Sequence, residues 1–107
     1  MNDLINMLGI CRKAGKLVWG FDSVKNAVKA RSACLVVVSK ALSEKTQKEV
    51  SFVFQQQGVK MVQTPFTLDE FQFMISRKTG VIALCEPNLS NRVEQLLAAT
   101  EGGYDSL

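Results

Sequence analysis

The sequence contains no histidine, only two prolines and three cysteines, and no long run of apolar residues. The missing histidine removes the side chain that most often serves as a general base near neutral pH and as a metal ligand. No apolar run approaches the roughly 20 residues that a membrane-spanning helix needs. The first residues also lack the basic segment and long apolar stretch of a secretory signal. We therefore expect a cytoplasmic protein that neither crosses nor binds a membrane.

The three cysteines, Cys11, Cys34 and Cys85, are far apart and odd in number, which argues against a disulfide framework. Without histidine, their spacing also does not match that of a metal site. Cys34 and Cys85 stand in apolar sequence contexts. The pattern predicts small buried hydrophobic residues in a reducing compartment, and neither a metal nor a cofactor.

Other signs of catalysis are equally scarce. Gly15 and Gly20 do not have the spacing of a Walker or dinucleotide-binding loop, and no serine stands in a G-x-S-x-G setting. The adjacent carboxylates of Asp69 and Glu70 fall in the first turn of a predicted helix, where negative charge suits the helix dipole. We therefore predict that the protein is not an enzyme.

At 107 residues, with 47% hydrophobic and 21% charged residues, the chain has the size and composition of one globular domain. Its apolar periodicities predict helices at residues 2–14, after Gly20, and at 44–57, 68–75 and 89–99, and strands at 16–19, 33–39, 59–63 and 81–85. This alternation predicts an α/β fold, a three-layer α/β/α sandwich with a small mixed sheet. We expect the domain to cover residues 1–100, with residues 101–107 as a flexible C-terminal tail.

The rest of the chain is organised around residues 15–40. The run from Leu35 to Val38 is unbroken and rich in valine, which is typical of a central strand covered on both faces. The helix before it has an apolar stripe of Val24, Ala27, Val28 and, at its end, Arg31. Its opposite face carries Asp22, Lys25, Asn26 and Lys29. Asp22 or Ser23 is expected to cap the helix, and Ser43 and Thr67 are expected to cap the helices at 44–57 and 68–75.

Charge is distributed unevenly around the net value of +3. Residues 1–48 contain nine Lys/Arg and three Asp/Glu, whereas residues 49–107 contain four and seven. Loops in an open α/β sheet can gather at one edge. Here they would form a basic rim of Lys25, Lys29, Lys40, Arg77 and Lys78. Such a rim beside a helix N-terminus suits phosphate groups, and the alternative is a solvated surface that is uneven by chance.

Polar and aromatic side chains next to this rim suit nucleobases. Asp22, Ser23 and Asn26 offer hydrogen bonds to splayed bases, which is the usual way that structured RNA is read. Trp19 is a candidate for base stacking, and packing at the core or at its margin is the alternative for this residue.

The segment G-F-D-S-V-K-N-A-V-K-A-R-S-A-C-L-V-V-V resembles the signature of the L-seven-Ae and L-thirty-e ribosomal-protein family, which binds kink-turns in RNA. The family pattern G-x-N-E-x-x-K-A-[IV]-x-x-G-x-A-K-L-V aligns with it without gaps. The opening L-G-I-C-R-K-A-G-K-L-V-W-G is similar to L-G-L-A-x-R-A-G-K-[LV]-V-x-G of the small bacterial members. V-S-K-A-L-S-E-K-T, G-V-K-M-V-Q-T and G-V-I-A-L agree in outline, so that the likeness covers about residues 4–98. It implies a three-layer α/β/α fold that binds kinked RNA helices, usually without catalysis.

By position, the family's RNA-contacting Gly, Asn, Glu and Lys correspond here to Gly20, Asp22, Ser23 and Asn26. The family's second contact segment corresponds to Ile75, Ser76, Arg77 and Lys78. Three of the first four residues differ in type from the family pattern, and the family's lysine cation is missing. A further basic position of the family is Ala30 here, beside Arg31.

Together, these observations predict a non-enzymatic protein that binds structured, kink-turn-like RNA through the Gly20 turn, the second helix and the loop at residues 75–78. Ribosomal RNA is one candidate partner. We expect a monomer without DNA specificity. The alternative is a protein-interaction module of the same fold that has lost RNA affinity, and the three changed contact residues motivate it.

Overall fold

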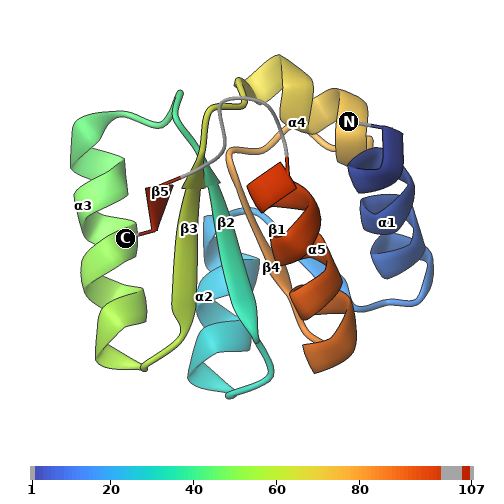
Figure 1. Ribbon diagram of the computed structural model, residues 1–107. Helices are drawn as coiled ribbons and strands as arrows, with labels where there is room; N and C mark the ends of the chain where they lie inside the picture. The colour runs from blue at the N-terminus through green and yellow to red at the C-terminus, as the bar shows by residue number, and fades with distance from the viewer. Residues whose placement is uncertain (1, 100–104, 107) are drawn as a thin grey trace.

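The computed structural model describes residues 2–99 and 105–106 of the chain (Figure 1). Helices and strands alternate as the sequence predicts, and the predicted bounds agree with the observed ones to within two residues. The helices are α1 (Asn2–Lys13), α2 (Phe21–Lys29), α3 (Glu44–Gln56), α4 (Leu68–Ile75) and α5 (Pro87–Ala99). The strands are β1 (Leu17–Trp19), β2 (Leu35–Ser39), β3 (Lys60–Thr64), β4 (Val81–Leu84) and β5 (Asp105–Ser106).

The strands form one mixed sheet in the order β1-β4-β2-β3-β5. β2 and β3 are parallel, with Val37 opposite Val62, and the other neighbouring pairs are antiparallel. β4, the last long strand in the sequence, is therefore inserted between β1 and β2. As a result, β1, β2 and β3 all run in one direction, and their carboxyl ends lie at one edge of the sheet, beside the amino end of β4 (Figure 1).

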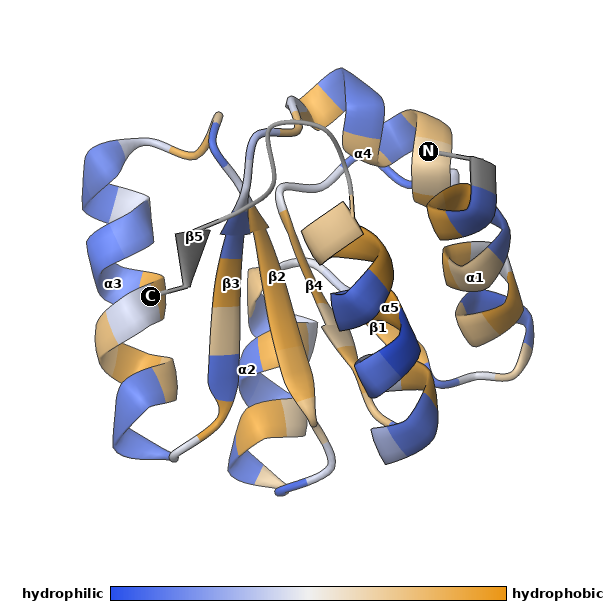
Figure 2. Ribbon diagram, in the orientation of Figure 1, coloured by the Kyte–Doolittle hydropathy of each residue, from blue (hydrophilic) through white to orange (hydrophobic). Residues whose placement is uncertain are grey.

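Helices cover both faces of the sheet, which confirms the three-layer α/β/α sandwich. α1, α4 and α5 pack on one face, and Leu35 and Val37 of β2 point towards them. α2 and α3 pack on the other face, which receives Val36 and Val38. All five residues of β2 are buried, because successive side chains of a strand point to opposite faces and both faces are covered here. Figure 2 shows the apolar character of β2 and β4 at the centre of the sheet.

The C-terminal end differs in part from the sequence prediction. Val62 and Gln63 of β3 pair with Ser106 and Asp105, so that β3 has a neighbour on both sides at these positions rather than forming a free edge. Within the predicted flexible tail, residues 105–106 thus belong to the sheet. Residues 101–104 and 107, the rest of that tail, lie outside the described residues, as do residues 1 and 100 of the predicted domain.

The cysteines only partly match their expected burial. Cys11 of α1 is fully buried as predicted, whereas Cys34 and Cys85 are half-buried, because each lies just beyond the end of a paired strand. Burial raises the pKa of the Cys11 thiol. Burial also raises the pKa of the Cys85 thiol, with opposing contributions from a hydrogen bond with Ser32 and from the charge of Lys16.

No helix among the described residues combines the length and the apolar character that crossing a bilayer would require.

Candidate nucleic-acid interface

Three segments that are distant in sequence meet at the edge of the sheet where β1 and β2 end and β4 begins. Trp19 at the end of β1 lies opposite Ile82, and Val38 near the end of β2 lies opposite Val81. Just beyond these pairs, the Gly20 amide donates to the Val81 carbonyl at 3.0 Å, and the Ser39 amide donates to the Gly80 carbonyl at 2.8 Å. Backbone hydrogen bonds therefore hold the Gly20 turn and the Lys40 connection on either side of the loop that precedes β4.

A side-chain contact joins the first and last of these segments. The Arg77 guanidinium carbon lies 4.9 Å from the centre of the Trp19 ring, within the range of a cation–π interaction. Arg77 Nη1 also donates to the Ser76 carbonyl at 2.8 Å, which helps to orient the guanidinium. Trp19 remains 37% exposed. The two segments that the sequence predicts to contact RNA therefore touch each other in the folded protein.

The loop at residues 76–80 is shaped by its own residues. Ser76 ends α4 in the left-handed conformation, at φ 60°, which turns the chain sharply away from the helix. The Thr79 hydroxyl donates to the Val81 carbonyl at 3.0 Å and accepts from the Val81 amide. Gly80 is closely covered, because a Cβ there would lie 2.5 Å from Leu42 Cδ2 and 2.8 Å from Leu68 Cδ2. The loop is thus fixed at both ends.

Two buried hydroxyl groups brace the same edge from inside. Ser39 Oγ donates to the Phe66 carbonyl at 2.6 Å and accepts from the Ala41 amide at 3.0 Å. Thr64 Oγ1 donates to the Val38 carbonyl at 2.9 Å. Ser39 thus ties the end of β2 to the connections that follow β2 and β3, and Thr64 ties the end of β3 to β2. The sequence does not predict these hydrogen bonds of Ser39 and Thr64. Its only indication is that each is a polar residue at the end of a mainly apolar strand.

The N-terminus of α2 lies at this edge of the sheet and has no side-chain cap among the described residues. Gly20 is its N-cap residue, at φ 88°, and no side chain within the described structure caps this end. The expectation that Asp22 or Ser23 caps α2 is therefore wrong, because the helix already begins at Phe21 and both residues lie inside its first turn. The first amides of α2 consequently have no side-chain acceptor and remain available to an anion.

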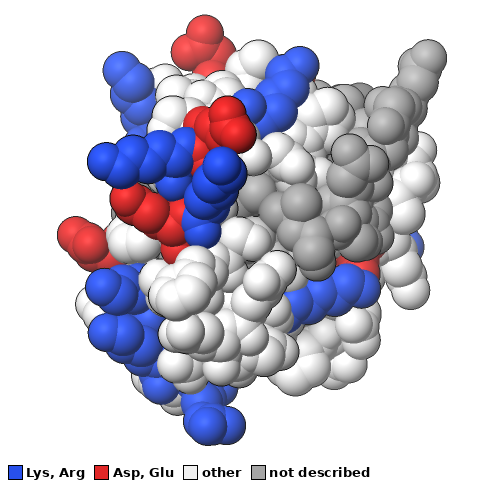
Figure 3. Space-filling view, turned by 90° about the vertical axis from the view of Figure 1, so that its left-hand side faces the viewer, with Lys and Arg blue, Asp and Glu red and all other residues white. Residues whose placement is uncertain are grey.

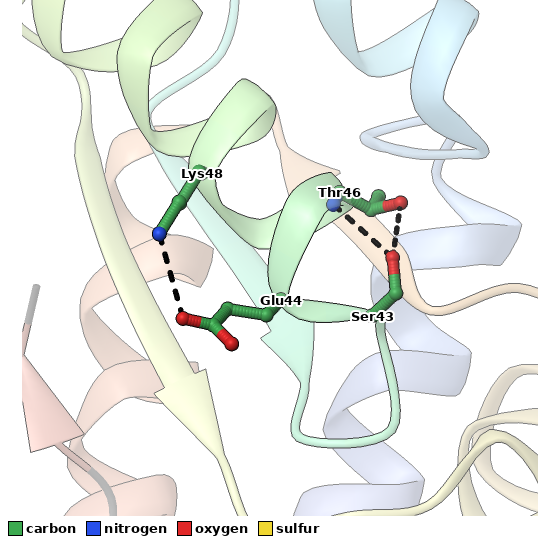
Figure 4. Close-up of polar contacts among 4 residues, drawn as sticks. All are labelled: Ser43, Glu44, Thr46 and Lys48. Carbon is green, nitrogen blue, oxygen red and sulfur yellow. Dashed lines mark hydrogen bonds and ion pairs between the residues drawn. The ribbon is translucent and has the colours of Figure 1, made fainter.

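The three helices that follow α2 are capped by their own side chains. Ser43 Oγ accepts from the Thr46 amide at the start of α3 (Figure 4). Thr67 and Glu70 form a capping box on α4, and the Glu86 carboxylate accepts from the Leu89 amide in α5. Ser43 and Thr67 confirm the caps that the sequence predicts for α3 and α4. Among α2 to α5, only α2 presents an uncapped N-terminus.

Four cations belong to the segments that meet at this edge of the sheet. Lys25 is half-buried one turn into α2, and Lys40, Arg77 and Lys78 are exposed. None of these four residues has a carboxylate within ion-pair distance in the described part of the chain. We call these four residues the basic rim. Lys29, the other lysine of the expected rim, ends α2 about 13 Å along the helix axis from Gly20 and one turn beyond Lys25.

The charges of α3 balance one another, in contrast to those of the basic rim. Glu44 pairs with Lys48 one turn later at 3.4 Å (Figure 4). Figure 3 views the molecule from the side on which α3 lies and shows Lys and Arg gathered towards one side of this face, with Asp and Glu among the upper ones. α3 therefore adds little net positive charge next to the basic rim.

The remaining predicted contact residues divide into exposed and buried ones. Asp22, Ser23 and Asn26 are exposed on α2, as a contact role requires, and Ser76 is exposed in the loop. Ile75 is a correction, because it is only 1% exposed and packs in the core formed with α1 and α5. Its side chain therefore cannot contact a ligand, and it anchors the loop instead.

Comparison with known proteins establishes the fold. The sequence matches no family model, and no curated protein matches it at a significant level. A solved structure described as a protein with unknown function from Bacillus halodurans C is similar to this chain, with a TM-score of 0.78 and 20% sequence identity. The match covers 87% of this chain and 94% of that one. At this identity, the likeness shows a shared fold and leaves function to the site itself.

Proposed function

We propose that this protein binds structured, kink-turn-like RNA without catalysing a reaction. The observation that carries the proposal is the contact between Arg77 and Trp19, because it unites the Gly20 turn and the loop at residues 76–80 into one surface. A nucleic acid could then contact both segments at once. The resemblance to the L-seven-Ae and L-thirty-e family, which covers about residues 4–98, assigns RNA contact to the same two segments.

The chemistry of the surface supports a phosphate-rich ligand. The uncapped amides of α2 and the partial positive charge of a helix N-terminus favour anions. The basic rim adds four cations without acidic partners, so that binding a phosphate there breaks no existing ion pair. Ser23 and Asn26 are exposed one turn apart and can hydrogen-bond to the edges of splayed bases.

The wider biological setting belongs to the same proposal. We expect the protein to act in the cytoplasm as a monomer, with a structured RNA such as ribosomal RNA as its partner. Asp22 lies among the cations, and a carboxylate is compatible with RNA where it meets an amino group of a base. The proposed surface therefore has room for base recognition as well as phosphate contact.

The test is a titration of the protein with a kink-turn RNA at about 50 and 200 mM salt. We expect micromolar or tighter binding at low salt that weakens as salt rises. Lys25→Ala and Lys78→Ala should each weaken binding and lower the salt slope by roughly 0.7–0.9, because each removes one phosphate contact. Lys13→Ala is the matched control: it removes the same charge from the end of α1, outside the basic rim, and should change binding little.

Two results would contradict the proposal. One is the absence of binding to any structured RNA at low salt. The other is binding that Lys25→Ala and Lys78→Ala affect no more than Lys13→Ala does. Either result would favour the alternative, a protein-interaction module of the same fold, and partners recovered equally well after ribonuclease treatment would support that alternative directly.

A further inference from the structure

Trp19 occupies an unusual place for a large aromatic side chain. It ends the short strand β1 and stands next to the uncapped N-terminus of α2, where it remains 37% exposed. Neither of the two buried clusters of the sandwich includes it. Its described aromatic contact is with Arg77, which is itself exposed. A role in core packing therefore does not account for this residue.

The contact between Arg77 and Trp19 arranges two flat groups at the surface. The guanidinium is planar and lies 4.9 Å from the centre of the indole ring. Its hydrogen bond to the Ser76 carbonyl restricts its rotation, and the left-handed Ser76 sets the direction of the loop. Both indole rings and guanidinium planes stack on nucleobases in RNA complexes. The pair thus offers stacking groups that the protein fold has already positioned.

We propose that Trp19 and Arg77 form a stacking platform for a single unpaired nucleobase. This inference rests on the proposed function and adds the feature of the RNA that the site would recognise. A base inside a continuous duplex already stacks on its neighbours, so only a base turned out of the helix has a free face. The platform therefore selects RNA with a bulged or splayed nucleotide over fully paired RNA of the same charge.

The surroundings of the platform fit a whole nucleotide. Gly20 follows Trp19 directly, and the free amides of α2 begin immediately after it. A phosphate bound at these amides would place its own nucleotide, or the next one, beside the indole ring. Lys78 adjoins Arg77 in the loop and supplies a cation for the adjacent backbone. Phosphate binding and base stacking would thus use neighbouring groups of one surface.

Trp19 provides its own reporter, because it is the only tryptophan in the chain. The experiment compares tryptophan fluorescence during titration with two RNAs at low salt: a kink-turn RNA with unpaired bases, and a fully paired duplex of equal length. Stacking should change the fluorescence intensity with the kink-turn RNA and leave it nearly unchanged with the duplex. Replacing the unpaired nucleotides one at a time by abasic sites should identify the base that stacks.

Variants separate stacking from charge. Trp19→Ala should weaken binding of the kink-turn RNA by roughly 5- to 150-fold, the range for loss of one stacked base, and should change duplex binding little. Arg77→Lys keeps the charge but removes the plane, and should likewise weaken kink-turn binding selectively. Lys78→Ala should weaken binding of both RNAs alike. Trp19→Phe keeps an aromatic face and should retain much of the affinity.

The outcomes distinguish this inference from the proposed function. If the kink-turn RNA binds with the expected salt dependence while the fluorescence does not change, the platform is wrong and RNA binding stands. Equal fluorescence changes with both RNAs would also overturn the platform, because selection of an unpaired base would be absent. If neither RNA binds at low salt, the proposed function and the platform fail together. The fluorescence readout uses the unmodified protein, so it does not depend on the folding of any variant.

Discussion

Ser39 and Ser90 are both buried serines, yet their hydroxyl groups differ in what they contact. Ser39 Oγ bridges the Phe66 carbonyl and the Ala41 amide behind the basic rim. Ser90 Oγ in α5 is buried without a hydrogen-bond partner in the described structure. The energetic effect of a buried hydroxyl depends on whether its bonds are made, so these two residues should respond in opposite ways to the same substitution.

Ser39→Ala should lower the free energy of unfolding by about 1–3 kcal/mol, because it leaves a buried carbonyl and an amide without their partner. Ser90→Ala should be neutral or slightly stabilising, because it removes a polar group that makes no bond. Urea denaturation followed by far-UV circular dichroism measures both. An equal loss in the two variants would show that hydroxyl bonding at Ser39 does not brace this edge of the sheet.

At the scale of elements, the Asp22 carboxylate in α2 has two opposite effects. It stabilises the helix, and it repels a phosphate bound at the helix N-terminus. Asp22 lies in the first turn of α2 and Asp69 in the first turn of α4. Both carboxylates stabilise their helices through the positive end of the helix dipole. Only Asp22 lies at the uncapped helix end beside the basic rim, where its charge also opposes a phosphate. Stability and ligand binding therefore make opposite demands on this position.

Asp22→Asn should lower the free energy of unfolding by about 0.3–1 kcal/mol and at the same time raise RNA affinity several-fold at low salt. Asn is also the residue that the family pattern has at this position. Asp69→Asn serves as the control, with a similar loss of stability and no gain in affinity. Denaturation curves and RNA titrations of the two variants make the comparison. A loss of affinity in Asp22→Asn would indicate that the carboxylate itself contacts a base.

Local signals in the sequence predicted most of the elements. The apolar run of β2, the Ser43 cap of α3 and the Thr67 cap of α4 act between residues close in the chain, and the structure confirms them. The misassigned contact residue has another cause. Ile75 is buried because α1 and α5, remote in sequence, pack over it.

At the scale of the whole molecule, β2 connects the two buried clusters. Alternate residues of this strand enter the cluster beneath α1, α4 and α5 and the cluster beneath α2 and α3. If the helices on one face of the sheet came away, the strands that also support the other cluster would be exposed to water on that face. A domain of this size with such shared strands should fold as one cooperative unit.

We therefore expect a single unfolding transition in urea. Far-UV circular dichroism follows the helices of both layers, whereas Trp19 fluorescence follows the edge of the sheet at the end of β1. The two probes should give the same midpoint and the same slope within error. Separate midpoints would show that the edge carrying the basic rim opens independently of the rest of the sandwich.

The order of the strands was the part of the fold that the sequence left undetermined. Composition and periodicity predict that β4 is a buried strand, but they do not specify its neighbours. Its insertion between β1 and β2 depends on the combined packing of helices on both faces. The same insertion brings Arg77 to Trp19, so the decisive contact of the candidate site followed from topology and could not be read from either segment alone.

Because Trp19 and Arg77 come from opposite halves of the chain, the platform exists only while those halves are assembled. A nick in the backbone between them would leave every one of its atoms present, and separation of the two fragments would abolish it. Conversely, a ligand that contacts both segments holds them together, and it raises the free energy of unfolding with the logarithm of its concentration once that concentration exceeds the dissociation constant. The contact between Trp19 and Arg77 would thus serve both to bind the ligand and to hold the two halves of the chain together.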